Sequence, residues 1–138
     1  MKDYAREENG AKIIMATSVD DRFPPEHMLD GKDSSFWMTT GMFPQEFVLA
    51  LENPTNVSKI TTLSMNVKKL AVEKSEKENS GSFEKVFEVE LASRGDRLQT
   101  EVHQVSIRAK YLKFTLLSGH CENAAVNRIS VVGEPVGS

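Results

Sequence analysis

The chain has 138 residues, of which 39% are hydrophobic and 27% charged, with a formal net charge of −3 and a pI near 5.6. This length suits a single domain large enough to bury a core, and the absence of a basic excess excludes nucleic acid and anionic membrane surfaces as expected partners. No stretch approaches the roughly 20 apolar residues of a membrane span, residues 1–12 hold no apolar run typical of a signal peptide, and the single Cys121 fits a reducing cytosolic compartment.

Short apolar and β-branched segments separated by turn residues make up most of the chain. We expect flexible termini at 1–11 and 135–138, one domain over 12–134, and a charged hairpin tip at 74–82. A helical turn with proline at its first position is expected at Pro25–Leu29. The predicted strands are 12–17, 45–51, 57–67, 70–76, 83–91, 98–107, 111–117 and 126–132. This pattern, without a long amphipathic helix, favours an all-β antiparallel sandwich or barrel.

The segment Asp30–Trp37 (DGKDSSFW) is the strongest candidate site. Its possible oxygen ligands are the carboxylates of Asp30 and Asp33, the hydroxyl of Ser35, and the backbone carbonyl of His27 or Met28. Such ligands suit Ca²⁺, and the Phe-Trp pair at the end of the segment would be buried and hold the loop in place. The alternative is a turn whose two Asp side chains only accept hydrogen bonds from backbone N–H groups. Spacing alone does not separate these alternatives, because the loop lacks the helix-flanked calcium pattern.

A second feature is the segment Thr39–Phe47 (TTGMFPQEF), which joins two aromatic residues through a glycine and a proline. We expect Met42 and Phe43 at a turn. Exposed Met and Phe beside polar residues indicate a surface for a partner. The alternative is a plug that covers one end of the sandwich.

Patterns that would indicate catalysis are absent from the sequence. There is no Gly-x-Ser-x-Gly elbow, and no metal-binding pair at helical spacing is formed by His27, His103 or His120. Cys121 follows His120, but an activated thiol needs an oriented base and positive surroundings, so an inert buried or edge cysteine is favoured. Glu88 and Glu90 share a strand face that we expect to meet solvent. We therefore predict that the protein is not an enzyme.

Several of these segments together resemble a known family. Leu29-Asp30-Gly31 followed by Ser35-Phe36-Trp37 resembles the D-G-x-x-x-[ST]-x-W signature of discoidin-like, galactose-binding-type jelly rolls. Residues 14–18, 24–26, 36–37 and 39–47 are similar to the intraflagellar transport protein 25 (heat-shock protein beta-11) family, most densely over residues 13–51. The resemblance implies a galactose-binding-domain-like jelly roll of eight to nine antiparallel strands.

The resemblance also implies a structural calcium ion in the loop before the tryptophan. Its ligands by position are Asp30, Asp33, Ser35 and the carbonyl of Met28 or His27. The family's last-strand Glu has no counterpart, because residues 126–132 offer only Asn127, Arg128 and Ser130. Asn127 could supply a neutral oxygen. Fewer charged ligands predict a weaker site.

The function implied by the resemblance is that of a non-catalytic subunit of the intraflagellar transport B complex. This subunit would form a heterodimer with a Rab-like small GTPase subunit, intraflagellar transport protein 27, and meet other B-complex subunits. Its expected location is the cilium or flagellum and the cytoplasm around the basal body. We expect the partner surface on one sheet face, with the outward residues of strands 98–107 and 111–117 as candidates. The alternatives are a calcium-dependent discoidin-type module for carbohydrate or lipid headgroups and, less favoured, a holdase chaperone.

Overall fold

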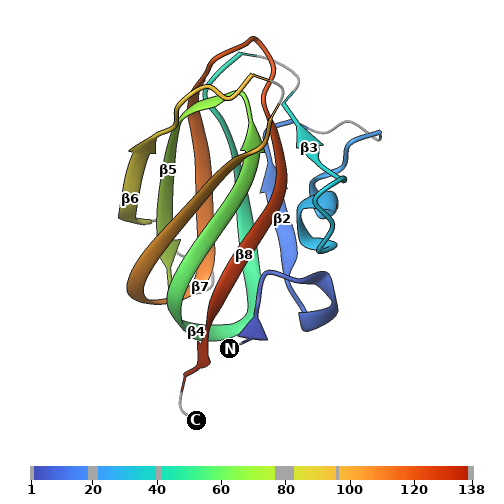
Figure 1. The fold of residues 1–138 in the computed structure, drawn as a ribbon. Coiled ribbons are helices and arrows are strands. Elements are labelled where there is room, and N and C mark those ends of the chain that lie inside the picture. Colours follow the sequence, from blue (N-terminus) through green and yellow to red (C-terminus); the bar gives the residue numbers. More distant parts are fainter. Residues whose placement is uncertain (1, 19–21, 40–41, 77–82, 96, 137–138) are drawn as a thin grey trace.

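The computed structural model describes residues 2–18, 22–39, 42–76, 83–95 and 97–136, which form antiparallel strands and two short 3₁₀ helices (Figure 1). The strands are β1 (Lys2–Asp3), β2 (Lys12–Ala16), β3 (Trp37–Met38), β4 (Gln45–Met65), β5 (Val67–Ser75), β6 (Glu84–Glu90), β7 (Gln99–Gly119) and β8 (Ala125–Pro135). The 3₁₀ helices are η1 (Glu7–Asn9) and η2 (Pro25–Leu29). The predicted all-β fold is confirmed. Parts of the predicted turn at 39–41 and of the hairpin tip at 74–82 lie outside the described residues.

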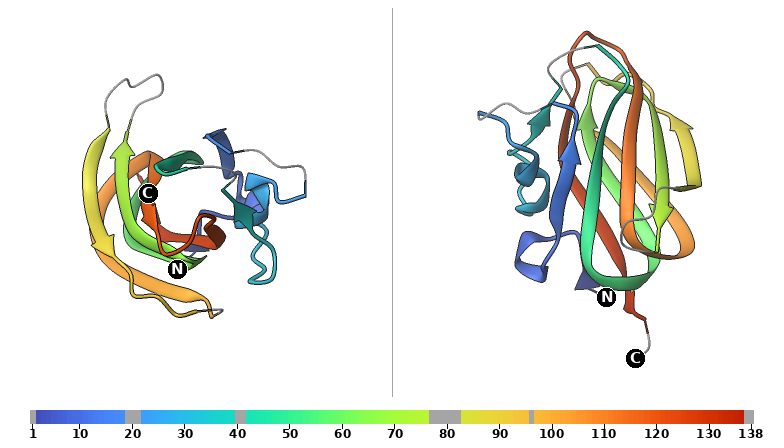
Figure 2. Two further views of the ribbon diagram at one scale, coloured as in Figure 1. Left: turned by 90° about the horizontal axis from the view of Figure 1, so that it is seen from above. Right: turned by 180° about the vertical axis from the view of Figure 1, so that it is seen from behind.

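The described strands form one hydrogen-bonded sheet that curls round on itself when seen from above (Figure 2). Its main order is β1-β8-β4-β7-β5-β6, with β2 paired to β4 and β3 paired to β8. β4 pairs with β2 over its first residues and with β8 over its last ones, while β7 lies along its other edge throughout. β4 and β7 therefore belong to both layers of the sandwich.

β4 and β7 are each one long strand where the sequence predicts two. The pairing of β4 with β7 is irregular between Ala50 and Thr55, around Asn53 and Pro54. These two residues are poor strand formers and predict a break. The strand bends there and continues, so the predicted strand ends near residues 51 and 107 are wrong. A bulge or bend explains this, because it changes a strand's direction without ending its pairing.

The core lies between the two layers, and side chains alternate between inside and outside where the first part of β4 pairs with the second part of β7. The inward side chains of this paired region are at most 1% exposed: Phe47, Leu49, Leu51, Leu112, Phe114 and Leu116. Phe47 pairs with Phe114 across the strands, and their rings stack with centroids 5.0 Å apart. Aromatic side chains of this size contribute much of a core's buried apolar surface.

Residues 2–11 are packed against the sheet, so the prediction of a loose terminus is wrong for them. β1 pairs with β8, and the Asp3 carboxylate accepts hydrogen bonds of 2.9 Å from the backbone N–H groups of Ala5 and Val131. Ala5 and Ala11 are buried. At the other end, β8 runs to Pro135, one residue into the predicted flexible tail. Among the described residues, no helix has the length and apolar character needed to cross a membrane.

Candidate functional site

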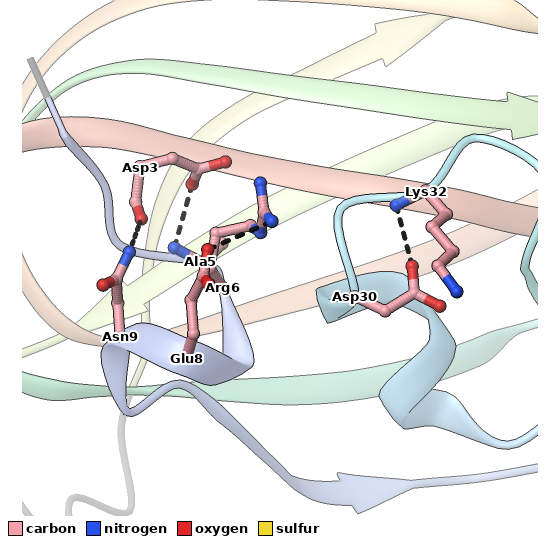
Figure 3. A network of polar contacts seen from close by, with 7 residues as sticks. All are labelled: Asp3, Ala5, Arg6, Glu8, Asn9, Asp30 and Lys32. Atoms are coloured by element: carbon pink, nitrogen blue, oxygen red, sulfur yellow. Dashed lines mark hydrogen bonds and ion pairs between the residues drawn. The ribbon is translucent and has the colours of Figure 1, made fainter.

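The predicted helical turn is present as η2 and leads directly into the candidate loop. Met28 and Leu29 at its end are buried. The chain leaves the helix at Asp30 and turns at Gly31, whose φ of +77° lies in the left-handed region that favours glycine. The Asp30 Oδ1 accepts a hydrogen bond of 2.8 Å from the backbone N–H of Lys32 (Figure 3). The Asp30 side chain therefore forms the turn expected if the loop holds no ion, in which an Asp carboxylate accepts a hydrogen bond from a backbone N–H group.

The N-terminal segment lies beside this turn, as Figure 3 shows. A Cβ atom at Gly31 would meet the guanidinium of Arg6, the end of a flexible side chain that can shift, so the positive φ and not this contact favours glycine there. Arg6 forms an ion pair of 3.1 Å with Glu8. An open hollow of about 380 Å³ is lined by Arg6, Glu7, Glu8, Leu29 and Asp30. The backbone of the loop is thus supported from a segment distant in the sequence.

The start of β8 holds the second half of the loop through two adjacent side chains. Asn127 Nδ2 donates a hydrogen bond of 2.8 Å to the backbone carbonyl of Asp33. Arg128 Nη1 forms an ion pair of 3.0 Å with the Asp33 Oδ1. Asp33 is therefore fixed at its main chain by one β8 residue and at its carboxylate by the next.

Trp37 connects the loop to the core. Its side chain is fully buried, its Nε1 donates a hydrogen bond of 2.8 Å to the carbonyl of Ser18, and its ring packs edge-on against Phe47. The predicted burial of Trp37 is confirmed. Phe36 is only half-buried and stacks on Phe23 with centroids 4.8 Å apart, outside the main core. The expected burial of the pair is therefore wrong for Phe36, which forms a peripheral stack with Phe23, and Trp37 alone of the two is the anchor.

Of the four predicted ligand residues, Met28 lies near the end of η2, whereas Asp30, Asp33 and Ser35 lie in the short connection between η2 and β3. Beside them, the Asn127 Oδ1 is buried and has no hydrogen-bond partner. A buried oxygen is normally satisfied by a hydrogen-bond donor or an ion, and an all-oxygen donor set fits a hard cation. No group of three or more His, Cys, Asp or Glu that could hold a metal occurs among the described residues. The negative charge of the loop therefore comes from two carboxylates, and Arg128 offsets one of them.

The loop at residues 42–44 has one residue that fits each of the two alternatives given for the segment Thr39–Phe47, a surface for a partner and a plug at the end of the sandwich. Met42 is 88% exposed, whereas Phe43 is half-buried against the core. The Gln45 side chain fixes the loop, because its Nε2 donates to the Met42 carbonyl at 2.7 Å and its Oε1 accepts from Thr17 and Ser18 at 2.6 Å each. Met42 is available to a partner, while Phe43 closes the sandwich end. Thr40 and Gly41 lie outside the described residues.

The outward residues of β7 differ between its two halves. Thr100, Val102 and Gln104 are exposed, Val102 by 54%. Tyr111, in the second half, is 9% exposed and packs on Val48 in a small outer cluster. Only the first half therefore presents the open surface expected of a partner face.

Groups that could act in catalysis are engaged elsewhere. The His120 Nε2 lies 2.8 Å from a backbone carbonyl and is not directed to Cys121, which is exposed rather than buried. Glu88 and Glu90 are exposed, as expected. Hydrogen bonds from Lys85 and then Lys69 hold the pKa of Glu88 below its ordinary value. Glu88 therefore acts as a surface ion-pair partner of Lys69 and Lys85.

Known proteins resemble the chain over nearly its whole length. The family model of the F5/8 type C domain matches residues 13–131. Intraflagellar transport protein 25 of Chlamydomonas reinhardtii is 74% identical over 133 residues, which cover 96% of this chain and 70% of that protein. The chain belongs to the intraflagellar transport protein 25 family. A family member from Homo sapiens, the intraflagellar transport protein 25 homolog, is 35% identical and is matched over 94% of its length by 97% of this chain.

Solved structures share the jelly-roll fold of this family member. A CBM32 domain from Clostridium perfringens in complex with GalNAc-β-1,3-galactose has a TM-score of 0.81 at 22% identity, covering 96% of this chain and 100% of that one. The family 32 CBM from C. perfringens NanJ in complex with galactose has a TM-score of 0.76 at 20% identity, covering 94% and 96%. At these identities the likeness shows the fold alone. The predicted galactose-binding-type jelly roll is confirmed.

Proposed function

We propose that the chain is a non-catalytic, binding subunit of the intraflagellar transport machinery, located in the cilium or flagellum and in the cytoplasm around the basal body. The observation that carries this proposal is the 74% identity to the Chlamydomonas transport protein over 96% of the chain. The finer proposal is membership of the B complex through a heterodimer with the Rab-like small GTPase subunit, intraflagellar transport protein 27. Met42 is exposed, and so are three uncharged residues on β7: Thr100, Val102 and Gln104. Both features are compatible with binding to other proteins.

Co-expression with the Rab-like subunit is expected to give a one-to-one complex that survives size-exclusion chromatography at low micromolar concentration. Permanent partners bury large, apolar interfaces and therefore remain associated on dilution. Light scattering on the eluted peak measures the mass of the complex, and an unrelated small GTPase is the control. Separate elution of the two subunits would contradict the heterodimer while leaving the family membership unchanged.

We also propose that the Asp30 loop binds a structural calcium ion. The residues that would hold it are Asp30, Asp33 and Ser35, the carbonyl of Met28, and the amide oxygen of Asn127. The support comes from the oxygen-only donor set and from the buried, unpartnered Asn127 Oδ1. A bound ion supplies positive charge that offsets the two carboxylates and ties the loop to β8.

Calcium is expected to raise the melting temperature of the protein, and a chelator to lower it. A ligand that binds only the folded state stabilises it by about 2.7 kcal/mol at one hundred times its Kd. Calorimetry should find no calcium shift for Asp30→Ala, whereas Ser34→Ala, at an exposed neighbouring position, should keep it. Magnesium at equal concentration should act less, because it demands a stricter octahedral geometry. An unchanged wild-type melting temperature with chelator would leave the loop as a capped turn.

The alternative is a calcium-dependent module for carbohydrate or lipid headgroups. The two carbohydrate-binding structures described above are sugar complexes, but their low identity to this chain limits the comparison to the fold. The hollow beside Asp30 has no aromatic side chain in its lining, and neither does a second hollow of about 360 Å³ bordered by Asn56, Arg108 and Glu134. Aromatic side chains are prominent in small-molecule sites, so this alternative has less support. Calcium-dependent binding on a glycan array would favour it.

A further inference from the structure

Arg128 lies against one of the two carboxylates assigned to the calcium site. Its Nη1 is 3.0 Å from the Asp33 Oδ1, and the two side chains are 31% and 55% exposed. The Arg128 backbone pairs with Leu63 of β4 in the interior of the sheet. The guanidinium therefore comes from a strand of the sheet and not from the loop itself.

From this arrangement we infer that Arg128 sets the affinity of the loop for its cation by competing for Asp33. The inference rests on the proposed calcium site. A cation that takes the Asp33 carboxylate must displace the guanidinium or share the oxygen atoms with it, and either case adds a cost to binding. The loop contributes two carboxylates, those of Asp30 and Asp33. The Arg128 guanidinium competes with the cation for one of these two.

The two adjacent β8 residues have opposite effects on the ion. Asn127 holds the Asp33 main chain through its Nδ2, and its buried Oδ1 has no hydrogen-bond partner and is the oxygen assigned to the cation. Arg128 instead occupies the Asp33 carboxylate. β8 thus keeps the loop in place without an ion and lowers the affinity for one. Removing Arg128 should tighten calcium binding, and removing the ion from the wild type should leave the loop closed.

Titration calorimetry with calcium chloride on the full chain tests this inference. Arg128→Gln is expected to bind calcium roughly two- to fivefold more tightly than the wild type, the range of a partly exposed ion pair. Arg128→Lys keeps the charge and should stay within about twofold of the wild type. Arg108→Gln is the matched control, because Arg108 is 55% exposed and its guanidinium forms an ion pair of 3.9 Å with Glu76, outside the Asp30 loop. Its affinity should not change.

Thermal unfolding gives a second measurement that does not depend on heats of binding. The calcium-induced rise in melting temperature should be larger for Arg128→Gln than for the wild type. Arg128→Met keeps the apolar stem and carries the same expectation if the glutamine variant does not fold. Equal or weaker calcium binding by the neutral variants would overturn the role of Arg128 while the calcium site stands. Absence of binding in the wild type and in every variant would overturn both.

Discussion

Replacing Trp37 with alanine is expected to lower the free energy of unfolding by about 3–5 kcal/mol. The side chain is fully buried and its ring centroid lies 5.2 Å from that of Phe47, so truncation leaves a cavity beside the core. It also leaves the Ser18 carbonyl without the indole donor. Because small proteins have total stabilities of only about 5–15 kcal/mol, the loss takes a large share. Urea unfolding followed by circular dichroism measures it.

Phe36→Ala is the matched control for the tryptophan variant. Phe36 is the next residue in the chain, but it is half-buried and stacks only on Phe23. Its removal should cost about 1 kcal/mol, the order of one aromatic pair. Equal losses from the two variants would contradict the assignment of Trp37 as the anchor that joins the loop to the core.

Features set by neighbouring residues could be predicted from the sequence. Proline, which favours the first position of a helix, predicted a helical turn at Pro25–Leu29. The structure has η2 with these same bounds. The apolar pattern of residues 45–51 predicted a strand there, and β4 begins at Gln45. The single tryptophan after an acidic, glycine-containing turn predicted a buried anchor. Each signal depends on spacings of a few residues, which local stereochemistry determines.

Contacts between distant residues could not be predicted in this way. Asp3 looks like part of a polar tail, yet its carboxylate is fixed by a backbone N–H 128 residues away. The partners of Asp33 come from β8, which is 94 residues along the chain at Asn127. Asn127 could be considered from the sequence as a neutral ligand, but nothing in its neighbourhood assigned Arg128 to Asp33. The balance of charge in the loop is therefore a tertiary property.

The full lengths of β4 and β7 could not be predicted from the sequence pattern either. Asn53 and Pro54 interrupt the apolar pattern of β4, and such residues usually end a strand. The strand continues because its irregular pairing at this point leaves the backbone hydrogen bonds on both sides intact. Sandwich folds use such bends to pass one strand between layers.

Gly133→Ala is expected to cost about 3 kcal/mol or more, above the usual 1–3 kcal/mol of an overpacked core. A Cβ atom at this position would collide with the backbone oxygen of Asn56 and reach the Cα of Val57. Val57 is the partner of Gly133 in the β4–β8 ladder, which is irregular at the next position. A backbone atom in a ladder cannot rotate away as a side chain can. Thermal unfolding of the variant measures the loss.

Gly95→Ala separates this steric effect from the effect of losing a glycine. Gly95 has a φ of +62° and open space around its Cα, so its substitution should cost about 1 kcal/mol through backbone strain alone. Similar losses at the two positions would mean that β8 moves away from β4 at little cost. Such a movement would also carry Arg128, which lies in the same strand, and the calcium affinity of Gly133→Ala should then differ from that of Gly95→Ala. A rigid β8 predicts a large difference in stability between the two variants and equal calcium affinity in the folded protein.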